Sequence, residues 1–116
     1  RADTRRWLAE GDLLITPTMP YDGYPARGPY PAEIDGGPAH HSGPALFTIP
    51  FNLSFHPAAT LRAGLSSRGL PIGMQIVGHR HRDDLVLQAA HAFEQVRPWH
   101  PHWPEPWGRG TSPVAK

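Results

Sequence analysis

The 116-residue chain contains no cysteine, which excludes disulfide frameworks, thiol nucleophiles and thiolate zinc sites. It also has no run near the roughly 18 consecutive apolar residues that a membrane-spanning helix requires, so we expect no membrane partner. Lysine is nearly missing as well, because Lys116 at the last position is the only one. Chemistry that depends on a buried lysine is therefore not expected from this chain alone.

Neither sign of charge is in excess. The 11 Lys and Arg residues against 10 Asp and Glu residues leave a formal net charge of +1. Such a balance provides no long-range field that would attract nucleic acid, so we expect no nucleic-acid partner. The length suits a single domain of ordinary size.

Two more absences concern the start of the chain. The sequence begins with Arg1, and its only methionines are Met19 and Met74, so we expect a piece of a longer protein or a processed product. Residues 1–10 have no apolar signal-peptide core, and we expect a cytoplasmic location.

The first half of the chain predicts little regular structure. Residues 1–10 fit the last turns of a helix. The apolar run 12–16, between Gly11 and Pro17, predicts a strand that is covered on both faces. Residues 17–44 contain seven prolines and many glycines, which predicts a long loop.

The second half predicts a hairpin. Residues 45–53 fit either a short buried helix interrupted by Pro50 or an irregular apolar segment, and their spacing does not separate the two. Residues 58–63 and 72–77 are short extended runs joined by a glycine-containing connection, which predicts an antiparallel β-hairpin.

Residues 82–96 give the clearest helical pattern. Asp83 or Asp84 is expected to cap the first turn, and Pro98 is expected to end the helix. Four apolar residues at helical spacing predict the buried face, namely Val86, Leu87, Ala90 and Phe93.

Two separated segments resemble one known family, the amidase-signature hydrolases. DLLITPTMP, residues 12–20, is similar to the strand and Thr-Pro loop that follow a long helix there. Residues 47–95 resemble that family's C-terminal stretch of turn, strand, Gly-Leu-Pro-x-Gly-x-Gln, second strand and final helix. The matching residues are Asn52, Ser54, Pro57, Ala58, Gly69, Leu70, Pro71, Gly73, Gln75, Ala90, Phe93 and Glu94.

The resemblance implies an α/β fold, a partial mixed-sheet sandwich. Residues 1–98 would form the C-terminal portion of the domain, and residues 99–116 would form a Pro/Trp-rich tail. It also implies hydrolysis of carboxylic amides through a seryl-acyl intermediate, by a Ser–cis-Ser–Lys triad and without metal or organic cofactor. The triad region is missing here, so we expect no catalytic residue and no activity from the chain alone. The expected partners are the missing N-terminal portion, in the same or a separate chain, and a small amide substrate.

Four residues are candidates for the substrate pocket by the same resemblance, with simple packing as the alternative: Phe47, Thr48, Thr16 and Tyr21. Five others are expected to be structural turn residues: Asn52, Gly69, Pro71, Gly73 and Gln75. Asn52 and Gln75 would act through side-chain hydrogen bonds to the backbone.

Two residues depart from the family pattern. Phe55 stands where the family has a glycine, so a tight turn must carry a bulky side chain. Arg62 stands where the hairpin strand usually has proline. Either its guanidinium points to solvent or the fold is disturbed there.

Three other features have plainer interpretations. Ser66 and Ser67 fit a hairpin turn better than a nucleophile loop. Histidine pairs at 40–41, 79–81 and 100–102 lack the ligand spacing of a zinc site, so no metal is predicted. The tail supports an alternative function, a non-catalytic interaction module that uses its Pro/Trp-rich sequence.

Overall fold

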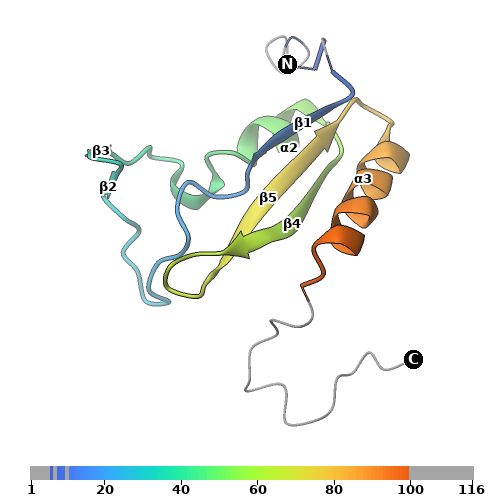
Figure 1. Cartoon of the computed structure of the whole chain (residues 1–116). Coiled ribbons are helices and arrows are strands. Elements are labelled where there is room, and N and C mark those ends of the chain that lie inside the picture. Colours follow the sequence, from blue (N-terminus) through green and yellow to red (C-terminus); the bar gives the residue numbers. More distant parts are fainter. Residues whose placement is uncertain (1–5, 7, 10, 100–116) are drawn as a thin grey trace.

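A computed structural model describes residue 6, residues 8 and 9, and residues 11–99. Its elements confirm a mixed α/β fold (Figure 1). In chain order they are β1 (Leu13–Pro17), β2 (Glu33–Ile34), β3 (Gly37–Pro38), the short 3-10 helix η1 (Gly43–Ala45), α2 (Ile49–Ser54), β4 (Ala58–Leu65), β5 (Pro71–Gly78) and α3 (Asp83–Val96).

The main sheet has three antiparallel strands in the order β1-β5-β4. The predicted hairpin is confirmed, and both of its strands are longer than expected. Strand β5 is central, which explains why Gln75, Ile76, Val77 and Gly78 are all buried. Strand β1 lies at the edge, and Ile15 is 61% exposed. The expectation that this strand is covered on both faces is therefore wrong for the described structure.

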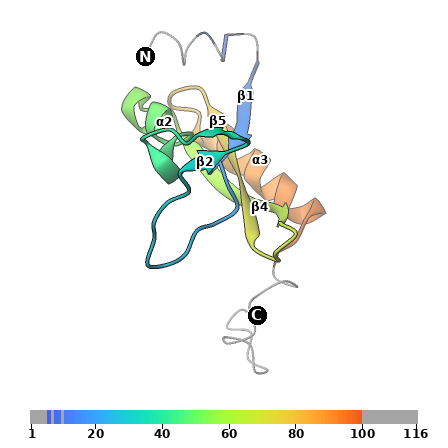
Figure 2. The ribbon, with the colours of Figure 1, turned by 90° about the vertical axis from the view of Figure 1, so that its left-hand side faces the viewer.

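The two longer helices cover opposite faces of the sheet (Figure 2). Helix α3 packs closely on Gly78, where a Cβ atom would lie 2.6 Å from the Val86 Cγ2 atom. Gln75, three residues earlier in β5, points to the other face and bonds to the segment that precedes α2. The buried apolar side chains are Leu8, Phe51, Ile76, Val77, Val86 and Ala90.

Helix α3 confirms the predicted helix but not all of its details. Its N-cap is Arg82, with no side-chain cap, and Asp83 and Asp84 lie inside the first turn. The predicted aspartate cap is therefore wrong, although negative charge at this end still favours the helix. Leu87 is 66% exposed, which corrects its placement on the buried face. Val86 and Ala90 define that face, and Leu87 lies about 100° around the helix from Val86.

The segment 17–44 is mostly irregular, but it contains a small hairpin that the predicted loop missed. Strands β2 and β3 pair Glu33 with Pro38 and Ile34 with Gly37. Asp35 and Gly36 between them have φ values of 51° and 73°. Two successive positive φ values make the tight turn that suits short hairpins, and Asp-Gly is a common sequence for it.

The ambiguous segment 45–53 contains helix α2. Pro50 lies in the first turn, where its missing N–H costs no intrahelical hydrogen bond, so it does not interrupt the helix. The predicted helix at 1–10 and the tail at 99–116 fall almost entirely outside the described residues. Within the described ranges, no helix is both long and apolar enough to cross a membrane.

Phe55 ends α2 in the left-handed conformation, with φ 59° and ψ 38°, as the family's glycine position requires. The turn is kept, and the Phe55 side chain is 67% exposed. A bulky side chain in the tight turn is thus confirmed, and the surface position accommodates it.

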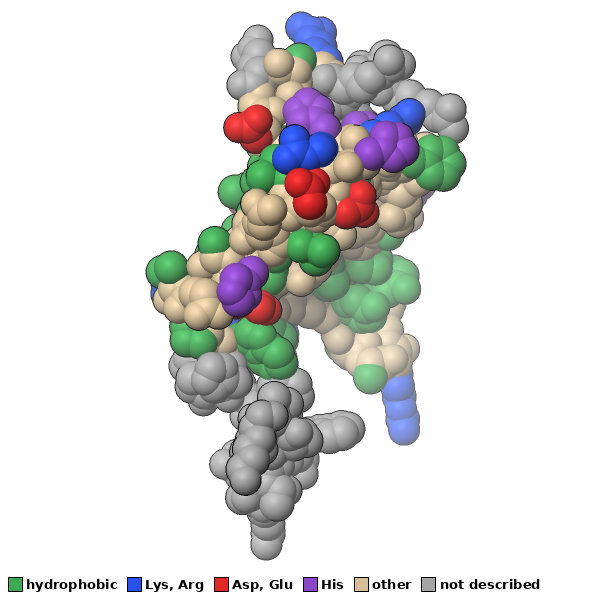
Figure 3. Space-filling model, turned by 90° about the vertical axis from the view of Figure 1, so that its right-hand side faces the viewer, with side chains coloured by type: hydrophobic (Ala, Val, Ile, Leu, Met, Phe, Trp, Pro, Cys, Tyr) green, Lys and Arg blue, Asp and Glu red, His purple; other side chains and the backbone are tan. Residues whose placement is uncertain are grey.

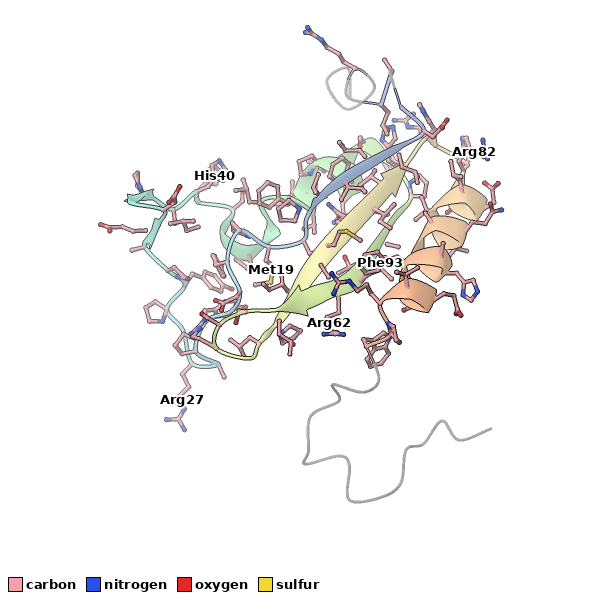
Figure 4. All side chains as sticks on the ribbon, in the orientation of Figure 1. Met19, Arg27, His40, Arg62, Arg82 and Phe93 are labelled. Carbon is pink, nitrogen blue, oxygen red and sulfur yellow. The ribbon has the colours of Figure 1, made fainter. Side chains whose placement is uncertain are left out.

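Arg62 is half-buried rather than directed freely into solvent. Its Nη2 atom donates a hydrogen bond to the Pro98 carbonyl at 3.3 Å, just after α3. Figure 4 shows Arg62 and Phe93 where β4 passes the end of that helix. The strand pairing shifts between Arg62 and Gly64 as a β-bulge, so the disturbance is local and the strand continues.

Candidate functional site

The best-connected polar side chain belongs to Gln75 in β5, which is only 3% exposed. Its Nε2 atom donates to the Thr16 Oγ1 atom and to the Phe47 carbonyl, both at 3.0 Å. Both acceptors come from segments far apart in the sequence. The amide therefore fixes strand β1 and the segment before α2 relative to the centre of the sheet.

Thr16 extends this connection. Its hydroxyl accepts the bond from Gln75 and donates its own proton to the Pro17 carbonyl at 3.0 Å. Thr48, the neighbour of Phe47, donates instead to the Ala45 carbonyl at 3.2 Å. Three of the four predicted pocket residues therefore lie at one place, joined through Gln75, for which the sequence predicts only a role in holding a turn or strand end.

Two more threonines lie on the same face. Thr18 follows Thr16 by two residues, and Thr60 lies opposite Gln75 in the neighbouring strand. The Thr18 and Thr60 hydroxyls are 3.4 Å apart. They meet across Gly73, where a Cβ atom would lie 2.8 Å from the Thr18 Oγ1 atom. We call Thr16, Thr18, Thr60 and Gln75 the polar row.

Tyr21, the fourth predicted pocket residue, lies beyond the far end of the polar row. It lines an open hollow of about 530 Å³ that shares Thr18 and Thr60 with the row. Burial raises the pKa of the Tyr21 hydroxyl, and the nearby Tyr24 and Tyr30 rings add to the increase. The full lining is Thr18, Met19, Pro20, Tyr21, Asp22, Thr60, Leu61, Arg62, Pro71, Ile72 and Gly73.

An ion pair closes the outer side of this hollow. The Arg68 guanidinium contacts both carboxylate oxygens of Asp22, with the Nη2–Oδ1 distance at 2.5 Å and the Nε–Oδ2 distance at 3.2 Å. Hydrogen bonding from Arg68, and secondarily from Ser66, lowers the pKa of Asp22 to about 2. The pair ties the loop after β1 to the β4–β5 turn.

The sequence alone identified Thr16 but not its partners in the polar row. The alternation of side chains along a strand places Thr16 and Thr18 on one face. No signal in the sequence, however, gives the register that brings Thr60 and Gln75 beside them. Among the predicted turn residues, Asn52 is exposed on α2, Gly69 has φ 75° in the hairpin turn, and Pro71 begins β5.

A serine–histidine contact lies at the end of α2. The Ser54 Oγ atom is 2.8 Å from the His56 Nδ1 atom, and the Ser54 carbonyl accepts a hydrogen bond from the Arg80 Nε atom at 2.9 Å. Ser54 is 1% exposed, so a substrate does not reach its hydroxyl. The contact stabilises the turn after α2 and is not a nucleophile.

Ser66 has a turn role as well. Its hydroxyl accepts hydrogen bonds from the Arg68 and Leu70 backbone N–H groups at 3.2 and 3.3 Å. These bonds close the connection between β4 and β5, as expected for a serine in a hairpin turn.

Charged and histidine side chains gather around the loop that leads into α3 (Figure 3). There the His79 Nε2 atom bonds to the Gly11 carbonyl at 3.0 Å, and Arg82 pairs with Asp84 at 3.0 Å. In the part of the chain that the structure describes, no three side chains suited to metal ligation come together. The histidine pair at 100–102 lies outside the described residues.

Comparison with known proteins identifies the class. The sequence model of the family described as Amidase matches residues 1–87. The chain therefore belongs to the amidase family, and the resemblance to amidase-signature hydrolases is confirmed.

Two curated relatives illustrate the match. One glutamyl-tRNA(Gln) amidotransferase protein, from a Picosynechococcus strain, is 39% identical over 105 residues, covering 90% of this chain and 21% of the relative. Acylamidase from Rhodococcus erythropolis is 39% identical over 94 residues, covering 80% and 20%. The chain thus spans about a fifth of the length of the curated relatives that it matches.

Solved structures agree. A bacterial aryl acylamidase of the amidase-signature family has a TM-score of 0.76 and 34% identity, over 94% of this chain and 23% of that chain. The 6-aminohexanoate cyclic dimer hydrolase in complex with substrate has a TM-score of 0.68 and 34% identity, over 90% and 23%.

Proposed function

We propose that this chain is the C-terminal portion of an enzyme that hydrolyses carboxylic amides, and that it forms one wall of the substrate cleft. The observation that carries the proposal is the likeness to the aryl acylamidase, which extends over 94% of this chain. In this proposal residues 1–98 belong to the amidase domain, residues 99–116 form a tail, and the enzyme works in the cytoplasm.

The proposed reaction proceeds through a seryl-acyl intermediate. A serine oxygen attacks the amide carbonyl carbon, the C–N bond breaks, and a lysine passes the serine proton to the leaving nitrogen. Water then cleaves the ester, releases the carboxylic acid and restores the serine. The only lysine here is Lys116, so the remaining part of the domain must supply these groups, and the chain alone is inactive.

The contribution of this chain is to position the wall of the cleft. Gln75 holds Thr16 and the Phe47–Thr48 segment at fixed distances across the face that carries α2. Tyr21 borders the hollow at the other end of the polar row. An amide substrate that lies along this face would meet hydroxyl groups at its polar end and the Phe47 ring at its apolar end.

The chain alone provides the first test. Purified chain incubated with simple aryl and aliphatic amides is expected to release amine or ammonia only at the background rate. Turnover that disappears when a serine of this chain is replaced would refute the expected inactivity.

A chimera provides the second test. In it, this chain replaces the matching fifth of the Rhodococcus erythropolis acylamidase, and we expect the chimera to hydrolyse that enzyme's amides. Gln75→Met removes both donors and is expected to lower kcat/KM about tenfold, mainly by raising KM, because one lost hydrogen bond is worth about 1.4 kcal/mol. Gln88→Met, the same change at an exposed position of α3, is the matched control. Equal effects from both changes, or a folded chimera without turnover, would contradict the proposal.

A further inference from the structure

The backbone hydrogen bonds determine which groups of β1 face away from the sheet. The Thr18 N–H donates to the Gly73 carbonyl at 2.9 Å, which sets the alternation of the ladder between β1 and β5. Leu14 and Thr16 therefore point their N–H groups toward β5, whereas Leu13 and Ile15 point theirs outward. The bond from the Gly78 N–H to the Pro57 carbonyl, at 3.0 Å on the other side of β5, agrees with this alternation.

The outer edge of β1 has none of the usual features that prevent strand addition. The strand has no charged side chain and no bulge, and Ile15 is 61% exposed. Pro17 has its missing N–H on the outward side, so the ladder with β5 is complete up to the end of the strand. Among the described residues, no backbone group pairs with the N–H of Leu13 or Ile15.

The outer edge of β4 is different. A bulge follows Arg62, and the Arg62 guanidinium reaches the Pro98 carbonyl behind the strand. Bulges and charged side chains are the means by which proteins end a sheet at an edge strand. The two edges of the same sheet are thus built for different purposes.

We propose that the outer edge of β1 is the surface where a strand from the rest of the amidase domain joins this sheet, through the backbone groups of Leu13 and Ile15. The chain covers only 23% of the aryl acylamidase that it resembles, and its main sheet has three strands, fewer than the five or six that are usual. The proposal rests on this chain being one portion of a larger domain, but not on amide hydrolysis itself.

Residue-resolved hydrogen exchange tests the proposal in the isolated chain and in the acylamidase chimera. In the isolated chain, we expect fast exchange at Leu13 and Ile15 and slow exchange at Leu14 and Thr16. In the chimera, exchange at Leu13 and Ile15 is expected to slow at least 100-fold, while Leu14 and Thr16 stay slow. These last two residues are the internal control for a folded β1.

Three outcomes would overturn the proposal. The first is fast exchange at Leu13 and Ile15 in a folded chimera. The second is new protection at Ala58 and Thr60, which would place the junction on β4. The third is protection in the isolated chain that rises with its concentration, which would indicate a second copy of the chain.

A proline substitution separates the two sides of β1. Ile15→Pro removes only an outward N–H, so Leu14 and Thr16 are expected to stay protected in the isolated chain, while Leu13 loses its protection in the chimera. Leu14→Pro removes a bond to β5 and is expected to expose β1 in both. An inactive chimera with protected Leu13 and Ile15 would refute only the proposed hydrolysis, whereas an active chimera with fast exchange there would refute only the edge.

Discussion

Phe55 has the most demanding backbone conformation of the chain's large side chains. At φ 59° it occupies a region that costs a residue with a Cβ about 1 kcal/mol relative to glycine. We therefore expect Phe55→Gly to raise the free energy of unfolding by about 1 kcal/mol, measured by chemical denaturation. The side chain is 67% exposed, so its loss removes little buried area.

Phe55→Ala is the control for this prediction, since alanine keeps the backbone cost and also loses the phenyl ring. It should give no increase in stability. If alanine and glycine stabilise equally, the gain comes from removing the exposed ring and not from the backbone.

The Asp22–Arg68 pair makes a prediction about acid stability. The pKa of Asp22 is about 2 against an ordinary value of 3.8, so the pair stabilises the fold above about pH 4, and this contribution is lost as the pH falls through about 2. An NMR titration of the Asp22 carboxyl is expected to give a midpoint near 2. Arg68→Gln should move the midpoint toward 3.8.

Arg82→Gln is the matched control, because Arg82 pairs with Asp84 far from Asp22 along the chain. It should leave the Asp22 titration unchanged. A normal Asp22 midpoint in the unmodified chain would show that the ion pair does not persist in solution.

Among the elements, the contact between α3 and β5 depends on a missing side chain. An added Cβ at Gly78 would lie 2.6 Å from the Val86 Cγ2 atom, and Val86 is buried. Gly78→Ala must therefore move the helix or the strand, and we expect a loss of about 1–3 kcal/mol in the free energy of unfolding.

Gly64→Ala is the corresponding control within the same sheet. A Cβ there meets no atom within 4 Å, so thermal unfolding should be nearly unchanged. Equal losses at the two positions would mean that general strand effects, and not the helix contact, determine the cost.

The elements that the sequence predicted well are those with a strong local pattern. The hairpin of β4 and β5 and helix α3 follow from alternation, glycine placement and helical spacing. The β2–β3 hairpin was missed because each strand has only two residues, too few to show alternation. The exposure of Leu87 and Ile15 was missed because burial depends on which elements pack nearby, and local spacing does not contain that information.

The candidate site was predictable only in part, and for the same reason. The resemblance pointed to Thr16, Phe47, Thr48 and Tyr21, and the structure joins the first two through Gln75. That connection spans 59 residues on one side and 28 on the other. It exists only once the register of β1 on β5 is known. Their roles with a substrate remain a prediction.

As a whole molecule, the described part of the chain has a small core for its exposed apolar surface. Six apolar side chains are buried. Twelve large ones are exposed, namely Ile15, Tyr24, Tyr30, Ile49, Leu53, Phe55, Leu65, Leu70, Ile72, Leu87, Val96 and Trp99. A chain that spans a fifth of its relatives has this ratio because surfaces that are internal in the larger domain become external here.

The two hydrogen bonds of Gln75 have one more consequence. The Phe47 carbonyl can only accept a proton, so the side-chain nitrogen, and not the oxygen, must face it. Glutamate has the same shape but would bring an oxygen against that carbonyl, in a position that is 3% exposed. The centre of this sheet therefore distinguishes an amide from the corresponding acid, and deamidation at this single residue would separate the two segments that it joins.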